Sequence, residues 1–272
     1  MLSVSLTSLS GGVRALLDAA VSSIARDPDA EPGTQADRPF EAVQLDARRQ
    51  VRAEELGATA RRELRHRINE RGLKLSGLVF PLRGSVADAD RLDARLDALR
   101  QAMTLAFELG GRSVILPSGR LPEADSPEAD RLAEVLDVLA RHGARCGATL
   151  TLRLGSDAAE WAAWLDAVSE AAPVGVQFDA AAAVMAGQGV EEALRAVADR
   201  TVQLRLRDAV SESRTAGREV TLGRGEVDFD LLAGLSTELP SRPVLVVDPS
   251  DASAAQLRSG VAFARAVFEP SA

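Results

Sequence analysis

Short apolar runs alternate with longer segments of helical spacing along most of the chain. In "DALRQAMTLAFELGG" and "LAEVLDVLARHG", apolar residues recur at i, i+3 and i+4, which is typical of amphipathic helices. The glycines Gly72, Gly110 and Gly143 follow or close such stretches and predict helix ends. Between the helical segments lie eight apolar runs of strand length: 2–8, 41–47, 74–82, 113–119, 149–155, 174–180, 202–209 and 243–250.

The alternation of strand and helix predicts the fold class. Strand–helix–strand units form right-handed crossovers, which place their strands in a parallel sheet. Eight such units in 272 residues predict one closed (β/α)8 TIM barrel that spans residues 1–272 as a single domain. A doubly wound open sheet is the alternative. A doubly wound sheet is expected to carry a glycine-rich phosphate-binding turn after an early strand. The segment "LTSLSGGVRAL" resembles such a turn only weakly.

Polar side chains of one parity follow several of the predicted strands to their carboxyl ends. The opposite parity is apolar on the same strands, as at Leu150, Leu152, Val176 and Phe178. Because side chains alternate along a strand, the polar set should line the barrel mouth, where barrel enzymes carry their chemistry. The alternative is a solvated barrel rim. The polar set is Gln44, Asp46, Thr149, Thr151, Arg153, Gln177, Asp179, Gln203, Arg205, Arg207 and Asp248.

Three polar segments are predicted to be loops. The segment 26–39 joins the first helix to the second strand, at the face away from the barrel mouth. Segment 117–130 follows the fourth strand and therefore lies at the mouth. The longest loop at the mouth, 208–229, follows the seventh strand.

Composition and charge limit the classes of molecule that the protein is expected to bind. Apolar residues make up 46% of the chain, which is enough for a large core, and the net charge is −8 without a basic stripe, which argues against nucleic acid. The single cysteine, Cys146, excludes a disulfide within one chain, fits a cytoplasmic setting and favours a small packing residue over a nucleophile. No segment has the ~18 apolar residues of a membrane span, and the N-terminus lacks a signal-peptide pattern.

Several motifs together resemble a known family. They are "AVQLDA", "ALRQAMTLAFELGGRSVIL", "GATLTLRLG", "VGVQFDAAAAVMAGQGVEEALRAVADRTVQLRLRDA", "LGRGEVDFDLLAGL" and "PVLVVD". The chain resembles, over nearly its whole length, the sugar isomerases and epimerases with a xylose isomerase-like TIM barrel. The most specific piece is "LGRGEVDF", whose glycines permit the turn that leads the long loop back to the seventh helix.

The resemblance implies a divalent metal between four residues at the ends of strands five to eight, with two carboxylates moving a proton beside a sugar carbonyl. Carried over, these positions are Arg153, Asp179, Arg205 and Asp248. Arginine has no lone pair for a metal, and a dication 4 Å from a guanidinium is repelled by roughly 8 kcal/mol at an effective dielectric near 20. We therefore predict that the family's metal site is degenerate and that the chain uses no metal or other cofactor.

Neighbouring positions support this interpretation. The other histidine positions of the family pattern carry Ala182 and Gln203, while Arg207 and Asp208 keep its basic–acidic ending. The chain's own histidines, His66 and His142, lie in helical patterns near helix ends and are predicted to be surface or helix-end residues rather than metal ligands.

The replacement residues form a pattern of alternating charge. Read around neighbouring strands, the order is Arg153, Asp179, Arg205, Asp248. Adjacent strands lie about 4.8 Å apart, so each guanidinium could bond to the carboxylates on both sides. We therefore predict that Arg205 is a fixed cation that takes the place of the metal.

Two functions remain open at this stage. The first is a binding or structural protein without catalysis, which keeps a pocket for a small sugar or sugar-acid ligand and whose salt bridges mainly hold the barrel mouth together. The alternative is an isomerase or epimerase that uses Arg153 and Arg205 as electrophiles and Asp179 or Asp248 as the base. A metal-dependent abasic-site nuclease on the same barrel is set aside for want of histidines, and a homo-oligomer stays open. The predicted ligand-binding residues are Asp46, Arg153, Gln177, Gln203, Arg205 and Arg207, and the predicted catalytic residues are Asp179 and Asp248.

Overall fold

A computed structural model describes residues 1–24, 39–168, 174–213 and 216–269. Eight parallel strands close into one barrel in the order β1-β10-β7-β6-β5-β4-β3-β2. This confirms the predicted TIM barrel and excludes the doubly wound sheet. The strands are β1 (Leu2–Ser5), β2 (Ala42–Asp46), β3 (Lys74–Val79), β4 (Ser113–Pro117), β5 (Thr149–Leu154), β6 (Gly175–Asp179), β7 (Thr201–Leu206) and β10 (Val244–Val247).

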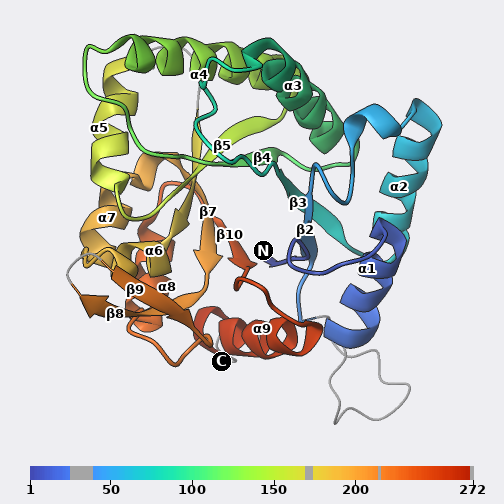
Figure 1. The fold of residues 1–272 in the computed structure, drawn as a ribbon. Helices are drawn as coiled ribbons and strands as arrows, with labels where there is room; N and C mark the ends of the chain where they lie inside the picture. The colour runs from blue at the N-terminus through green and yellow to red at the C-terminus, as the bar shows by residue number, and fades with distance from the viewer. Residues whose placement is uncertain (25–38, 169–173, 214–215, 270–272) are drawn as a thin grey trace.

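Helices surround the strands, as Figure 1 shows. None of those in the described part of the chain has the length and apolar character that a membrane crossing needs. The helices are α1 (Val13–Ala19), α2 (Ala58–Glu70), α3 (Leu92–Glu108), α4 (Pro127–Cys146), α5 (Ala158–Val168), α6 (Ala180–Met185), α7 (Val190–Ala196), α8 (Phe229–Glu238) and α9 (Ala254–Phe268), with short turns at Ala20–Ile24, Ala53–Glu55 and Ala198–Arg200.

Two of the three predicted helix ends are confirmed. Gly72 and Gly110 follow α2 and α3 with φ of 61° and 89°, in the left-handed region that favours glycine. The prediction for Gly143 is wrong, because α4 continues to Cys146 and its cap is Gly147, with φ of 84°. Gly143 is instead a site of close packing: a Cβ there would collide with the Ala148 carbonyl oxygen and with Met103.

The strand parity predicted from the sequence determines what is inside the barrel. Leu150, Leu152, Val176 and Phe178 are buried among the apolar residues that pack with the helices. The other parity fills the barrel with polar side chains, which are equally buried. They include Ser3, Ser5, Gln44, Asp46, Ser76, Thr151, Gln177, Asp179, Gln203, Arg205 and Asp248.

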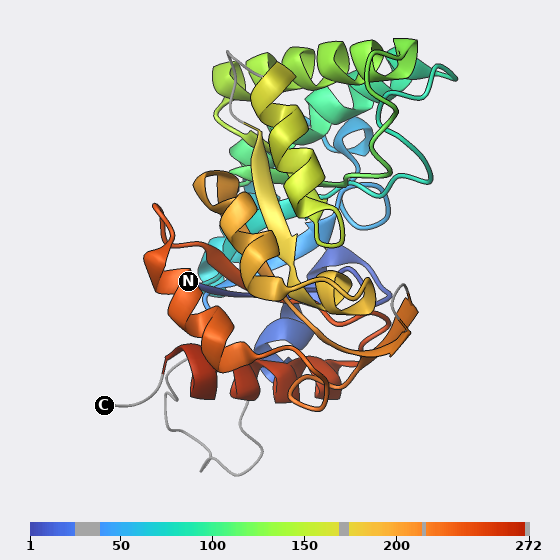
Figure 2. The ribbon, with the colours of Figure 1, turned by 90° about the vertical axis from the view of Figure 1, so that its left-hand side faces the viewer.

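The segment after β7 was predicted to be a loop, and this is wrong over most of its first half. It forms an antiparallel hairpin of β8 (Asp208–Ser213) and β9 (Ala216–Val220). In Figure 2 the hairpin and the chain's N-terminus lie on opposite sides of the molecule. The predicted loop 26–39 lies almost entirely outside the described residues.

The hairpin is held at its base by Asp208. The Asp208 carboxylate accepts hydrogen bonds from the backbone N–H groups of Ala209, Gly225 and Val227, at 2.9, 2.7 and 3.2 Å. Because a Cβ on Gly225 would collide with this carboxylate, the "LGRGEVDF" motif needs glycine here for close approach. The motif therefore returns the chain from the hairpin to α8.

Candidate functional site

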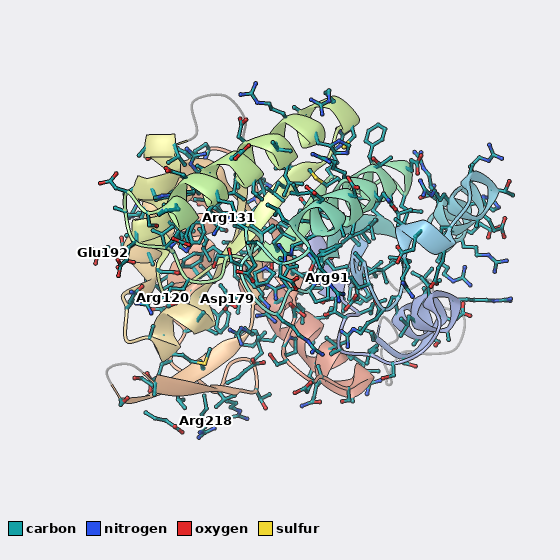
Figure 3. The ribbon with its side chains drawn as sticks, turned by 45° about the horizontal axis from the view of Figure 1, so that its top comes forward. Arg91, Arg120, Arg131, Asp179, Glu192 and Arg218 are labelled. Atoms are coloured by element: carbon teal, nitrogen blue, oxygen red, sulfur yellow. The ribbon has the colours of Figure 1, made fainter. Side chains whose placement is uncertain are left out.

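The register of the strands stacks the predicted site residues in two layers inside the barrel. Arg153, Gln177 and Gln203 are paired across β5, β6 and β7 in one layer. Asp179 and Arg205 are paired in the next layer, nearer the carboxyl ends of β6 and β7. Asp248 follows β10, two residues beyond Val246, which pairs with Arg205, and its carboxylate reaches back to the Arg205 side chain. Figure 3 shows Asp179 among the side chains of the interior.

Arg205 joins the two aspartates, as predicted. Its Nε donates to Asp248 Oδ2 at 2.7 Å, and its Nη1 donates to Asp179 Oδ2 at 2.9 Å. The residue is only 8% exposed. Burial disfavours the charged guanidinium, but the charges of Asp248 and Asp179 outweigh burial and raise its pKa above the ordinary value. Arg205 is therefore a permanently charged cross-link between β6, β7 and the end of β10.

The second cation at Asp179 is Arg207 rather than Arg153. Arg207 lies between β7 and β8, and its Nε donates to both carboxylate oxygens of Asp179 at 3.0 and 2.9 Å. Its Nη1 donates to Glu219 Oε2 on β9 at 2.6 Å. The expected Arg153–Asp179 pair is absent from the described contacts, because Arg207 occupies both oxygens of Asp179.

Asp179 has no free carboxylate oxygen to act as a strong base. Besides the two arginines, it caps α6 by accepting from the Ala182 backbone N–H at 3.1 Å. Burial opposes its ionisation, but the charges of Arg205 and Arg207 outweigh burial and lower its pKa. A carboxylate with a lowered pKa holds a proton poorly at neutral pH, which weakens its case as a proton-transfer residue.

Arg153 is held differently from the other two arginines. Its Nε donates to the neutral amide oxygen of Gln177 at 2.7 Å, and its contact with a carboxylate is a long one, from Nη2 to Asp248 Oδ2 at 3.4 Å. Its side chain is 22% exposed. Burial, and then the charge of Arg205, lower the pKa of Arg153 to about 10, so it stays protonated at neutral pH.

Below Arg153, glutamine amides form a hydrogen-bonded chain through the barrel. Gln177 Nε2 and Gln44 Nε2 both donate to Gln203 Oε1, at 2.8 and 2.7 Å. Gln203 Nε2 donates to the Ser76 carbonyl at 3.1 Å. Gln177 and Gln203 are 0% and 1% exposed, so they lie beneath the mouth rather than on its surface.

Asp46 lies at the same end of the barrel, but its carboxylate stabilises the turn that follows β2. One of its carboxylate oxygens accepts from the backbone N–H groups of Arg48 and Arg49, both at 2.8 Å. The other accepts from Arg49 Nε at 2.6 Å. The structure therefore brings Arg153, Asp179, Arg205, Arg207 and Asp248 together, and keeps Asp46 apart from them.

A cavity of about 250 Å³ opens over these charges. It includes Asp157, which the sequence analysis missed. Asp157 Oδ2 accepts from Trp161 Nε1 at 2.9 Å, and burial raises its pKa although that hydrogen bond opposes the shift. The only sequence signal was an aspartate four residues before a tryptophan at a helix start. The cavity is lined by Pro117, Ser118, Gly119, Arg153, Leu154, Gly155, Ser156, Asp157, Asp179, Ala182, Arg205 and Arg207.

Glu219 is a second residue at the mouth that no sequence pattern indicated. This residue links the hairpin to the mouth, because it accepts from Arg207 through one oxygen and from the Ser250 backbone N–H through the other, at 2.6 Å each. Its distance of twelve residues from Arg207, across a hairpin predicted as loop, left no pattern to find it by.

The residues at the mouth do not fit a divalent metal. Both carboxylate oxygens of Asp179 and Oδ2 of Asp248 already accept from arginines. In the described ranges, no group of three or more His, Cys, Asp or Glu side chains is arranged to hold a metal. The guanidiniums of Arg153 and Arg205, at positions where the resemblance implies ligands, offer no lone pair and repel a cation.

The family itself is settled by comparison of the whole chain. Residues 36–266 match the family model described as "Xylose isomerase-like TIM barrel". This chain belongs to the xylose isomerase-like TIM barrel family. The expected resemblance is therefore confirmed. No curated protein sequence matches the chain significantly.

Solved structures of low identity share the fold of this family member. A xylose isomerase domain protein from Planctomyces limnophilus superposes with a TM-score of 0.76 at 19% identity, covering 97% of this chain and 93% of that one. D-Psicose 3-epimerase with D-tagatose, from Clostridium cellulolyticum H10, gives 0.73 at 11%, covering 98% and 99%. A xylose isomerase-like TIM barrel protein from Mycobacterium smegmatis, in complex with magnesium, gives 0.71 at 16%, covering 98% and 96%.

Proposed function

We propose that this chain binds a small sugar acid at the barrel mouth without a divalent metal, and that binding rather than catalysis is its role. The observation that carries the proposal is the pairing of Arg153. It is the cation of the cavity whose closest partner is a neutral amide. A ligand carboxylate can match a planar guanidinium through two hydrogen bonds, so Arg153 is suited to receive one.

The acidic residues of the mouth support binding over proton transfer. Asp179 is bonded to two arginines and a backbone N–H, and Asp248 Oδ2 accepts from Arg205 and Arg153. A base within an ion pair gives up the attraction of its partners when it takes a proton. These carboxylates therefore hold the arginines in place.

The sugar-like part of the proposed ligand follows from the family. Among the structural neighbours, a D-psicose 3-epimerase was solved with D-tagatose. In this chain the cavity carries Ser118 and Ser156 beside Arg153 and Asp157, which suits a ligand with hydroxyl groups as well as one anionic group. We further propose that the chain acts in the cytoplasm as a single domain, in keeping with its one cysteine.

One observation favours catalysis as a second candidate. Asp157 lies in the cavity with a raised pKa, as a proton-transfer group needs, and Arg153 and Arg205 could polarise a carbonyl oxygen. Such an enzyme would exchange the carbon-bound protons of dihydroxyacetone in D2O, seen by NMR, and Asp157→Asn would abolish the exchange. If these protons exchange at the same rate with and without the protein, catalysis is contradicted and binding remains the proposed function.

Binding can be tested by calorimetry with D-gluconate and D-glucose, which differ in charge. We expect gluconate to bind and glucose to bind more weakly. Arg153→Met should weaken gluconate binding at least about tenfold, because a hydrogen bond to a charged group contributes ~1.5–3 kcal/mol. Arg62→Met, on the exposed face of α2, removes the same charge elsewhere and should leave the affinity unchanged. Equal loss in both variants, or gluconate that does not bind, would overturn the proposal.

A further inference from the structure

We propose that Gln177 is the positioning residue of the anion site: its neutral amide orients Arg153 without neutralising it. This inference rests on the proposed function and extends it to a residue that the ligand never touches. Gln177 is 0% exposed, in the middle of β6, and bonds to Arg153 Nε from below.

The three arginines of the mouth differ in the charge of their partners. Arg205 has two carboxylate contacts, at 2.7 and 2.9 Å, and Arg207 contacts Asp179 and Glu219 at 2.9 and 2.6 Å. The positive charges of these two are therefore matched closely. Arg153 has an amide at 2.7 Å and a carboxylate oxygen at 3.4 Å, which Arg205 already uses at 2.7 Å. The carboxylates of Asp179, Asp248 and Glu219 balance the three arginines formally, so Arg153 offers a ligand a guanidinium without a close carboxylate partner rather than an excess of charge.

The direction of the Gln177 amide follows from its neighbours. Arg153 Nε–H can only donate, so the amide oxygen of Gln177 must face it. The amide nitrogen of Gln177 then faces Gln203 Oε1, which accepts from Gln44 as well. The series of hydrogen bonds ends where Gln203 Nε2 donates to the main-chain carbonyl oxygen of Ser76. Turning any one amide over would place donor against donor or oxygen against oxygen, so the chain fixes the acceptor beneath Arg153.

A carboxylate at position 177 would still accept from Arg153 Nε but would cancel its charge, and its second oxygen would face Gln203 Oε1, to which the amide nitrogen donates in the wild type. Glutamate has the size of glutamine and would form an ion pair at the Nε position. Each of the three arginines would then have a close carboxylate partner, and the mouth would carry one more negative charge. The choice of amide over acid is what separates a permanently paired arginine from one that is available to an anion.

The experiment compares Gln177→Glu with Gln177→Met, using D-gluconate and calorimetry. Both variants remove the amide, but only the glutamate neutralises Arg153. We expect Gln177→Glu to weaken gluconate binding at least about tenfold and Gln177→Met to weaken it by less. Gln188→Glu, an exposed site, is the control for net charge and should bind like the wild type. Equal losses for Glu and Met, or wild-type affinity for Glu, would overturn the inference.

A second measurement needs no ligand and separates this inference from the proposed function. The Arg153 Nε–H resonance, assigned by its loss in Arg153→Met, should exchange slowly with solvent in the wild type and fast in Gln177→Met. If the Arg153 Nε–H exchanges slowly only when Gln177 is present, and the protein binds no gluconate, the positioning role of Gln177 is supported and the proposed binding function is contradicted. Exchange that Gln177→Met leaves unchanged would contradict the positioning whatever the ligand result.

Discussion

At the scale of single residues, the ion pairs between the arginines and the carboxylates determine the structure of the barrel mouth. Arg205 is the most enclosed of the three and is bonded to two aspartates that are 2% and 3% exposed. Removing it leaves Asp248 with the 3.4 Å contact from Arg153, while Asp179 keeps Arg207. The cost of losing Arg205 should therefore fall mainly on Asp248.

This leads to a stability prediction. Arg205→Ala should lower the free energy of unfolding by about 3–5 kcal/mol, because breaking a buried pair from one side strands a charge. Arg205→Met combined with Asp248→Leu should cost less than Arg205→Ala, because the aspartate that depends most on Arg205 is removed with it, while Asp179 keeps Arg207. Urea denaturation of the purified variants measures both. If Arg205→Ala unfolds at the same urea concentration as the wild type, Arg205 is not a structural cross-link.

At the scale of elements, the hairpin β8–β9 is coupled to the mouth at two points. At its base, Asp208 gathers three backbone N–H groups from the hairpin and the following turn. Along β9, Glu219 bridges Arg207 and the backbone of Ser250, which follows β10. The hairpin therefore stabilises the position of Arg207, and through it Asp179.

The base of the hairpin gives a prediction about Gly225. Gly225→Ala places a Cβ against the Asp208 carboxylate and the Ala209 carbonyl oxygen, so it should destabilise the protein by about 1–3 kcal/mol. Hydrogen exchange should then speed up at the amides of β8 and β9. Gly234→Ala in α8 is the matched control, because nothing lies within 4 Å of a Cβ there and helix propensity favours alanine. Unchanged exchange in Gly225→Ala would contradict the tight base.

At the scale of the whole molecule, the barrel explains how side chains about 95 residues apart in sequence form one site. Arg153 and Asp248 come from β5 and the end of β10, with β6 and β7 between them. Closure of the sheet brings their side chains to 3.4 Å. The same closure would bring four metal ligands together in a relative that carries them at these positions.

That geometry predicts that a metal site can be rebuilt. Arg153→Glu with Arg205→His restores the ligand types of the family, with Asp179 and Asp248 as the other two. Thermal melts with manganese should show stabilisation of the double variant, about 2.7 kcal/mol at a metal concentration of 100 Kd. The wild type should melt at the same temperature with and without manganese. A double variant that ignores manganese would mean that the arginines do not occupy a former metal position.

The sequence by itself determined the barrel and the central cross-link. Strand and helix periods are local, and eight alternations in one chain of this length leave few other folds. The parity of Asp179, Arg205 and Asp248 fixed which face they share, because side chains alternate along a strand. The bridge from Arg205 to both aspartates follows from the spacing of neighbouring strands, so it could be predicted without coordinates.

Only the tertiary structure decided how the remaining charges pair. Arg207 lies past the end of β7, where strand parity no longer determines the direction of a side chain. It pairs with Asp179 in the place where Arg153 was predicted to do so. Asp157 enters the cavity through the turn into α5, and Glu219 accepts from Arg207 across a hairpin that reads as loop in the sequence. Long side chains and loop backbones have many local conformations of similar energy. Which one forms depends on partners that are distant in sequence, and this is why sequence reasoning did not predict that the closest partner of Arg153 is the Gln177 amide.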